Sequence, residues 1–322
     1  MSRRFPTITA TLTTCALLGA TGCPQDDLPS QPDAGAPPLP SLRFEDPDAG
    51  SGPADLSCLG ERTQPVAGDE RSFTMAVVPF GAPPSVRVPG AVVHIFAGNE
   101  VPDDDICAAP DCVELVADEQ GEVTVEVPAE AWFAYRVLPM DGDEPTSTFL
   151  RTVESHLSPP EEGGRVENLN TITAATLNGL AASVGGEVRA ATGVVSGRLR
   201  DCQGRPLAGA VMRIFDEDGV EIELGPKVDD AQVYYFDGAV PPALDATGEY
   251  TSIDGRFAAV NMPPSGLARI ELWGVPEGEA EPVLVACEEL GIHADTLSVI
   301  ALLPTRSDGP TRCGEVPLSI SP

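Results

Sequence analysis

The chain has 322 residues and a formal net charge of −31, because 50 Asp and Glu residues outnumber 19 Lys and Arg residues. A surface this acidic repels phosphate groups, which excludes nucleic acid as a partner and disfavours contact with anionic lipid headgroups. The length allows two domains with additional segments.

Residues 1–22 have the features of an export signal, since a basic start precedes a short apolar run and small residues. The run is too short to cross a hydrocarbon core of ~30 Å as a helix. Cys23 follows Ala20-Thr21-Gly22, which resembles the lipobox of bacterial lipoproteins, although Leu is usual where Ala20 stands. The resemblance implies a mature chain that begins at a lipidated Cys23 and is anchored in the membrane. Ordinary signal cleavage, which would leave Cys23 as a plain thiol, is the alternative.

The residue after the lipobox bears on the choice of membrane. Pro24 stands where some inner-membrane lipoproteins carry an Asp retention signal, so the resemblance favours the outer membrane of the cell envelope. Residues 23–57 are rich in Pro, Asp, Gly, Ala and Ser, with few large apolar residues. Such a segment cannot bury enough surface to offset its ordering entropy. We therefore expect a disordered, extended tether between the anchor and the globular part.

The composition changes at residues 58–140, where short apolar alternations are separated by Gly, Pro and Asp. This pattern predicts antiparallel strands and a first β-sandwich. His94 lies on one of these strands, and we expect it to be partly exposed and without a role. Residues 141–192 form the predicted connector. Within it, residues 171–184 have a partial helical face that ends at Gly185-Gly186, which predicts a short helix, with a strand as the alternative.

Residues 193–322 are predicted to form a second β-sandwich, because turn residues again separate apolar alternations without helical periodicity. Two stretches resemble the carboxypeptidase regulatory-like (transthyretin-like) domain: V-x-G-x-L-x-D-x-x-G-x-P-L-x-G-A-V from Val195 to Val211, and T-x-x-D-G-x-F from Thr251 to Phe257. Such domains are usually accessory modules, so the resemblance implies a fold and brings no catalytic residues.

An internal repeat links the two predicted sandwiches. The segment GAVVHIF at residues 90–96 matches GAVMRIF at residues 209–215, and QGEV at residues 120–123 matches DGRF at residues 254–257. Matching segments occur in the same order in both halves. The expected fold class is therefore all-β, with two tandem Ig-like or transthyretin-like β-sandwiches joined by a short helical connector.

One aromatic triplet, Tyr234, Tyr235 and Phe236, is a candidate ligand platform, because aromatic rings can stack on sugar faces. Strand alternation favours a different interpretation, in which Tyr234 and Phe236 point into the core and Tyr235 points outward as a single ring.

Six cysteines remain in the mature chain after Cys15 and Cys23 are set aside, and an even number in an exported chain predicts disulfides. We expect Cys107 to pair with Cys112. Cys202 is expected to pair with Cys287 or Cys313, and Cys58 with the remaining cysteine. Clustered carboxylates on loops, such as Asp103-Asp104-Asp105, could hold Ca²⁺, but they lack the spacing of a Ca²⁺ loop and solvated turns explain them at least as well. No metal site and no cofactor are therefore predicted, and Ca²⁺ binding by these loops is the alternative.

The chain contains no G-x-S-x-G, H-E-x-x-H or phosphate-binding glycine motif. We therefore predict that it is not an enzyme. The expected function is that of a noncatalytic, surface-anchored lipoprotein that acts as a structural or interaction module of the cell envelope. Its expected partners are the membrane, through the lipid, and an envelope protein or a glycan. The alternatives are a carbohydrate-binding module and an accessory domain for a separate peptidase or secretion partner.

Overall fold

The computed structural model of the chain describes residues 39–46, 50–62, 69–80, 82–83, 85–98, 100–108, 112–128, 132–141, 148–160, 168–183, 186–225, 230–236, 249–306 and 313. Leu39–Pro322 forms one compact unit. The described residues are mostly β-strands, with a single α-helix, so the predicted all-β class is confirmed. The leader, Cys23 and residues 24–38 lie outside the described residues.

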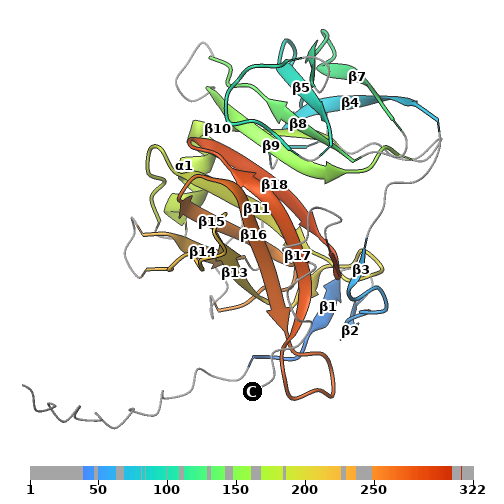
Figure 1. The fold of residues 1–322 in the computed structure, drawn as a ribbon, viewed down its shortest axis with the longest axis vertical. Helices are drawn as coiled ribbons and strands as arrows, with labels where there is room; N and C mark the ends of the chain where they lie inside the picture. The colour runs from blue at the N-terminus through green and yellow to red at the C-terminus, as the bar shows by residue number, and fades with distance from the viewer. Residues whose placement is uncertain are drawn as a thin grey trace, which may run out of the picture. The chain divides into compact units, whose positions relative to one another are not determined.

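The first half of the chain forms two layers of strands (Figure 1). β4 pairs with β7 and, in parallel, with β10, whereas β5 lies between β6 and β8, and β8 pairs with β9. Apolar side chains from both layers form one buried cluster that includes Val77, Val93, Val125 and Tyr135. The strands are β4 (Arg71–Pro79), β5 (Val92–Ala97), β6 (Cys112–Val116), β7 (Glu122–Val127), β8 (Phe133–Val137), β9 (Phe149–Leu157) and β10 (Leu169–Thr173).

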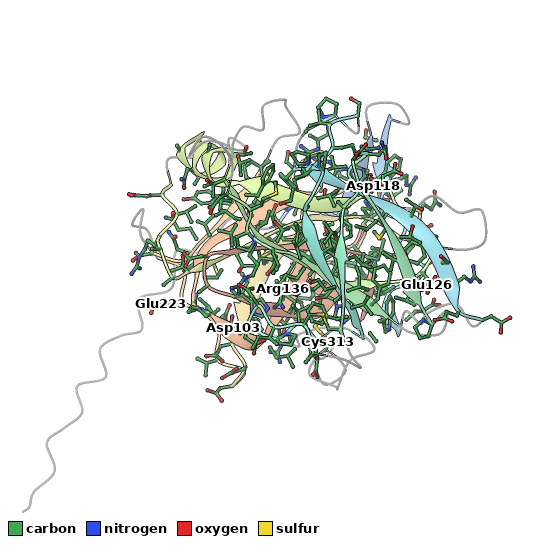
Figure 2. The ribbon with its side chains drawn as sticks, turned by 90° about the horizontal axis from the view of Figure 1, so that it is seen from above. Asp103, Asp118, Glu126, Arg136, Glu223 and Cys313 are labelled. Atoms are coloured by element: carbon green, nitrogen blue, oxygen red, sulfur yellow. A yellow bond between two sulfur atoms is a disulfide. The ribbon has the colours of Figure 1, made fainter. Side chains whose placement is uncertain are left out.

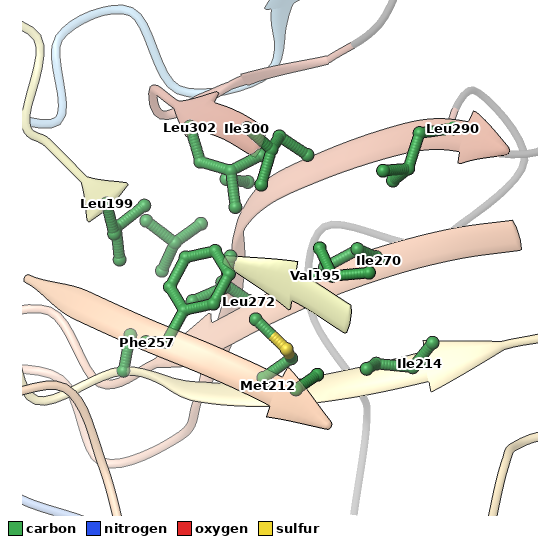
Figure 3. Packing of buried hydrophobic residues seen from close by; sticks show 14 of the residues in the cluster. Val195, Leu199, Met212, Ile214, Phe257, Ile270, Leu272, Leu290, Ile300 and Leu302 are labelled. Atoms are coloured by element: carbon green, nitrogen blue, oxygen red, sulfur yellow. The ribbon is translucent and has the colours of Figure 1, made fainter. Parts of the chain in front are cut away.

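The second half also forms two layers, and a larger apolar cluster lies between them (Figure 3). One layer has the order β14-β15-β11-β18, and the other has the order β13-β16-β17-β19-β3. The first layer contains β11 (Gly193–Leu199), β14 (Gln232–Tyr235), β15 (Arg256–Met262) and β18 (Thr296–Leu302). The second contains β3 (Glu61–Arg62), β13 (Val211–Phe215), β16 (Ser265–Gly274), β17 (Val283–Ile292) and β19 (Thr305–Arg306).

The predicted connector contains two strands, β9 and β10, in addition to a helix. β9 pairs with β8 and β10 on the side of the first half, and it also pairs in parallel with β18 of the second half. The strand β9 was not expected within the predicted connector, and it pairs with strands of both halves. Its central residues Thr152, Val153 and Glu154 are all buried. Because two of the three are polar, β9 lacks the apolar alternation that identifies a strand in the sequence.

The predicted tether ends earlier than expected, because residues 39–46 and 50–57 belong to the fold. β1 (Arg43–Asp46) pairs with β2 (Gly50–Pro53) and with the short β12 (Leu207–Ala208). Leu42 is buried in the core of the second half, and its N–H donates to the carbonyl of Val275 at 2.7 Å. Backbone pairing and a few scattered apolar residues, among them Leu42, Phe44 and Leu56, hold this segment, so its composition resembles that of a spacer.

The helix α1 (Ala174–Ser183) occupies most of the segment where a helix was expected, although residues 171–173 belong to β10. Thr173 caps it, because its hydroxyl accepts the N–H of Thr176 at 3.1 Å. Leu177 packs with Val194 and Leu297, so α1 covers part of the β11–β18 surface that faces away from the main core.

The segments of the internal repeat form equivalent pairs. β5 pairs with β8 in the first half as β13 pairs with β16 in the second, and both pairs are antiparallel. The N–H of Val77 donates to Gly121 at 2.9 Å, and the N–H of Leu199 donates to Gly255 at the same distance. Both glycines have positive φ, 71° and 64°, which other residues rarely adopt. The two halves therefore share backbone geometry at these positions as well as sequence.

Candidate functional site

Arg136 is a fully buried charged residue of the first half, and Figure 2 labels it together with Asp103. It lies on β8 and is fully buried, yet its guanidinium group reaches the loop at residues 101–107. Its Nη1 donates to the carbonyls of Pro102, at 2.7 Å, and Asp104. The same group lies 5.1 Å from the ring centre of Phe96. Burial lowers the pKa of Arg136, and the nearby Asp105 carboxylate opposes this effect. One buried cation therefore holds the loop.

His94 is the neighbour of Arg136 on β5, and it is fully buried. Its Nδ1 accepts a hydrogen bond from Arg136 Nη2 at 2.9 Å, so the proton is on Nε2, which lies 3.1 Å from Glu114 Oε2. The prediction of a partly exposed histidine was wrong. Both faces of β5 are buried, and the match between His94 and Arg213 in the repeat does not extend to their exposure.

The carboxylates of Asp103 and Asp105 are directed at basic side chains. Arg151 Nε lies 3.1 Å from Asp105 Oδ1, and Arg151 Nη1 donates to the Asp103 carbonyl at 2.9 Å. His293 Nδ1 lies 3.1 Å from Asp103 Oδ1. The loop carbonyls that could join a Ca²⁺ site accept hydrogen bonds from Arg136 and Arg151 instead. The carboxylates of Asp103 and Asp105 are thus each close to an arginine of the protein itself.

A potential metal-ligand group lies beside this loop. His94, Cys107 and Cys112 each offer one donor atom, and these atoms lie within 4.8 Å of one another. However, the two sulfurs are bonded in a disulfide, and both ring nitrogens of His94 have polar partners. The oxidised protein therefore offers no free donor from these three residues, and the cluster acts as a structural support for the loop.

The described residues contain three disulfides. Cys107 pairs with Cys112 as expected, but the expected partners of Cys202 were wrong, because Cys202 pairs with Cys58 and Cys287 pairs with Cys313. The sequence places Cys58 at the start of the first sandwich. In the structure it lies against the turn after β11, where the N–H of Cys202 donates to Asp55 at 2.9 Å.

Two rings of the aromatic triplet differ from the expectation, since Tyr235 rather than Tyr234 enters the core. Tyr235 is buried in the core, where its hydroxyl accepts the N–H of Met212 at 2.8 Å, and burial raises its pKa to about 12. Tyr235 lies opposite Phe257 in the β14–β15 pairing, so both rings enter the same core. Phe236 is also buried, and Tyr234 is half-buried and donates to the Gln232 side chain. The three rings form no common exposed surface.

Arg136 and Arg151 were missed by the sequence analysis. Arg136 stands in the otherwise apolar strand Phe133–Val137, all of whose residues are buried. A charged residue in the middle of such a strand is the signal that could have identified the cluster, because a buried charge needs partners.

No protein-family model matches the chain, and no curated protein matches it in sequence. Among solved structures, it is similar to a variant of the shaft pilin SpaA from Lactobacillus rhamnosus GG, at 14% identity over 73% of this chain and 98% of that chain, with a TM-score of 0.23. It is also similar to the minor pilin GBS52 of Streptococcus agalactiae, at 10% identity over 76% and 99% of the two chains, with a TM-score of 0.23. Because the TM-scores are low, these likenesses carry no argument about function. Among the described helices, none is long and apolar enough to cross a membrane.

Proposed function

We propose that this chain is an exported, lipid-anchored and noncatalytic module of the cell envelope, held at the outer membrane through Cys23. In this proposal its described part comprises two tandem transthyretin-like sandwiches, and it acts as a structural or interaction module. The observation that carries the proposal is the pairing of all six cysteines that follow Cys23. Disulfides of this kind form and persist in oxidising compartments.

The leader and the disulfides support the same compartment independently. The leader predicts export from its charge and apolar run, whereas the disulfides depend on side chains far from it in sequence. In the described fold, the most buried polar groups support structure. Arg136 holds a loop, and the Tyr135 hydroxyl donates to Glu154 at 2.6 Å and accepts the N–H of Asn170 at 2.7 Å. These contacts favour a scaffold over a reaction centre.

The glycan-binding alternative has less support, because the platform that it needs would consist of Tyr234, Tyr235 and Phe236. Two of these rings are buried. An accessory role beside a peptidase or a secretion protein remains compatible with the proposed anchor. Cross-linking of the membrane-bound protein followed by identification of its neighbours would favour that role if a peptidase or secretion protein were captured.

The anchor is tested by metabolic labelling with a fatty acid in the native host. We expect the wild-type chain to take up the label and to fractionate with membranes, because acyl chains add ~0.8 kcal/mol of membrane affinity for each buried CH₂. Cys23→Ala should abolish both. Cys15→Ala is the matched control, since it removes the other leader cysteine, and it should leave both unchanged. Equal labelling of the Cys23→Ala and wild-type chains would contradict the anchor.

A further inference from the structure

Three arginines gather on the face of the second half that is turned away from its main core. Arg198 on β11 lies directly opposite Arg256 on β15 in the antiparallel register. Their chain neighbours Leu199 and Phe257 are fully buried in the core, so by strand alternation the two arginines project from the other face. Arg200 follows Arg198 by two residues and lies on the same side.

The charges of these arginines are incompletely balanced. Arg256 Nε lies 3.0 Å from Asp254 Oδ2, and Arg200 Nη1 donates to the carbonyl of Gly204 at 2.7 Å. In contrast, the half-buried Arg198 side chain has no hydrogen bond or ion pair within the described part of the chain. Burial lowers the pKa of Arg198, as do the charges of Arg256 and Arg200, and only Asp254 opposes them.

This arrangement is unfavourable without a further anion. Like charges directly opposite each other on paired strands destabilise a sheet. The chain has 50 acidic residues against 19 basic ones, so carboxylate partners are abundant elsewhere. Arg213, for example, lies 2.8 Å from Glu221 through Nε and makes a second bond through Nη2. Arg198, which has no partner among the described residues and lies beside two other arginines, is therefore the side chain that an external anion would stabilise most.

We propose that the face formed by Arg198, Arg200 and Arg256 binds an oxyanion, the carboxylate or phosphate group of a small ligand. The planar guanidinium fork matches both groups and binds them through two parallel hydrogen bonds. A bound oxyanion would also relieve the repulsion between Arg198 and Arg256. At physiological salt, the repulsion between a bound anion and acidic residues more than ~8 Å away is largely screened. Binding therefore depends mainly on these three side chains. The inference goes beyond the proposed anchor and does not depend on it.

The test is titration of the full mature chain with inorganic phosphate and, separately, with citrate, with ionic strength held constant by NaCl. Thermal melting and calorimetry would measure binding. We expect a saturable rise in melting temperature with at least one anion, and an affinity at least tenfold weaker in Arg198→Gln. A response to phosphate alone or to citrate alone would identify the favoured group.

Arg213→Gln is the matched control, because it removes a strand arginine that already has a carboxylate partner, and it should bind as the wild type does. Arg256→Gln changes a second member of the face and tests the proposal if Arg198→Gln does not fold. Absence of any saturable response in the wild type would overturn the proposal. So would equal affinities in the wild type and in whichever of the two variants folds.

Discussion

Arg136 illustrates how a charged side chain is accommodated inside an apolar strand. Its donors reach three loop carbonyls and His94, and among the described residues no carboxylate lies closer to its Nε than Asp105 Oδ1, at 4.0 Å. Most of its partners are therefore neutral groups that the fold brings together. Their identity could not be predicted from the sequence, because the loop at residues 101–107 reads as a solvated acidic turn.

His293 makes stability depend on pH at the residue scale. It is buried, and burial lowers its pKa below the ordinary value of 6.5, while Asp103 opposes the shift only in part. In the unfolded chain the imidazole takes up a proton as the pH falls through 6.5, whereas the folded chain resists protonation. We therefore expect the free energy of unfolding contributed by His293 to fall as the pH drops below 6.5.

Urea unfolding at a series of pH values from about 7.5 to about 5.5 measures this effect. The His293→Gln variant retains a polar side chain but does not titrate, so its stability should fall less steeply over this range. Identical slopes for the wild-type and variant chains would show that His293 does not contribute.

At the level of elements, the sequence predicts strands where apolar residues alternate and turns where glycine is required. Gly121 illustrates the second case, since a Cβ there would lie 2.7 Å from Arg87 Cβ. β9 and β1 escaped prediction for physical reasons. β9 buries polar residues on a strand flanked by two others, and β1 is a four-residue strand in a segment whose composition resembles that of a spacer.

The disulfide between Cys58 and Cys202 ties the N-terminal segment to the second half, and its removal should be costly. It joins residues 144 positions apart, whereas Cys107 and Cys112 are only 5 apart. The chain-entropy model gives a difference of roughly 3 kcal/mol between loops of these sizes. Cys58→Ala/Cys202→Ala should therefore destabilise the protein by about 2–4 kcal/mol.

Denaturant unfolding of that double variant measures the loss, and Cys107→Ala/Cys112→Ala serves as its control. The control should lose less, because its loop is short and Arg136 also holds the segment. If the control lost more free energy of unfolding than Cys58→Ala/Cys202→Ala, the link between the N-terminal segment and the second half would contribute little to stability.

On the scale of the whole molecule, the two halves are connected at more than one place. The β9–β18 pairing joins them in one sheet, and His293 Nδ1 of the second half lies 3.1 Å from Asp103 Oδ1 of the first. Contacts between segments far apart in the chain have no local sequence signal. The connector predicted at residues 141–192 was therefore placed from the local composition alone. The six cysteines could be identified from the sequence, but two of their three pairings depended on where Cys58 lies in the fold.

The proposed anchor also limits how far the fold extends from the membrane. Only residues 24–38 separate Cys23 from the first described residue, Leu39. A segment of this length spans at most ~50 Å when fully extended. The spacer is thus shorter than the composition of residues 23–57 suggested, because β1 and β2 belong to the fold.

The central claim, an exported chain that is lipidated at Cys23 and stabilised by disulfides, is tested most directly by intact-mass measurement of the protein extracted from host membranes. We predict a polypeptide that begins at Cys23 with an acyl-containing adduct and is lighter by two hydrogens for each of the three disulfides than its reduced form. A chain that begins elsewhere, or that carries no lipid, would contradict the account, as would six free thiols.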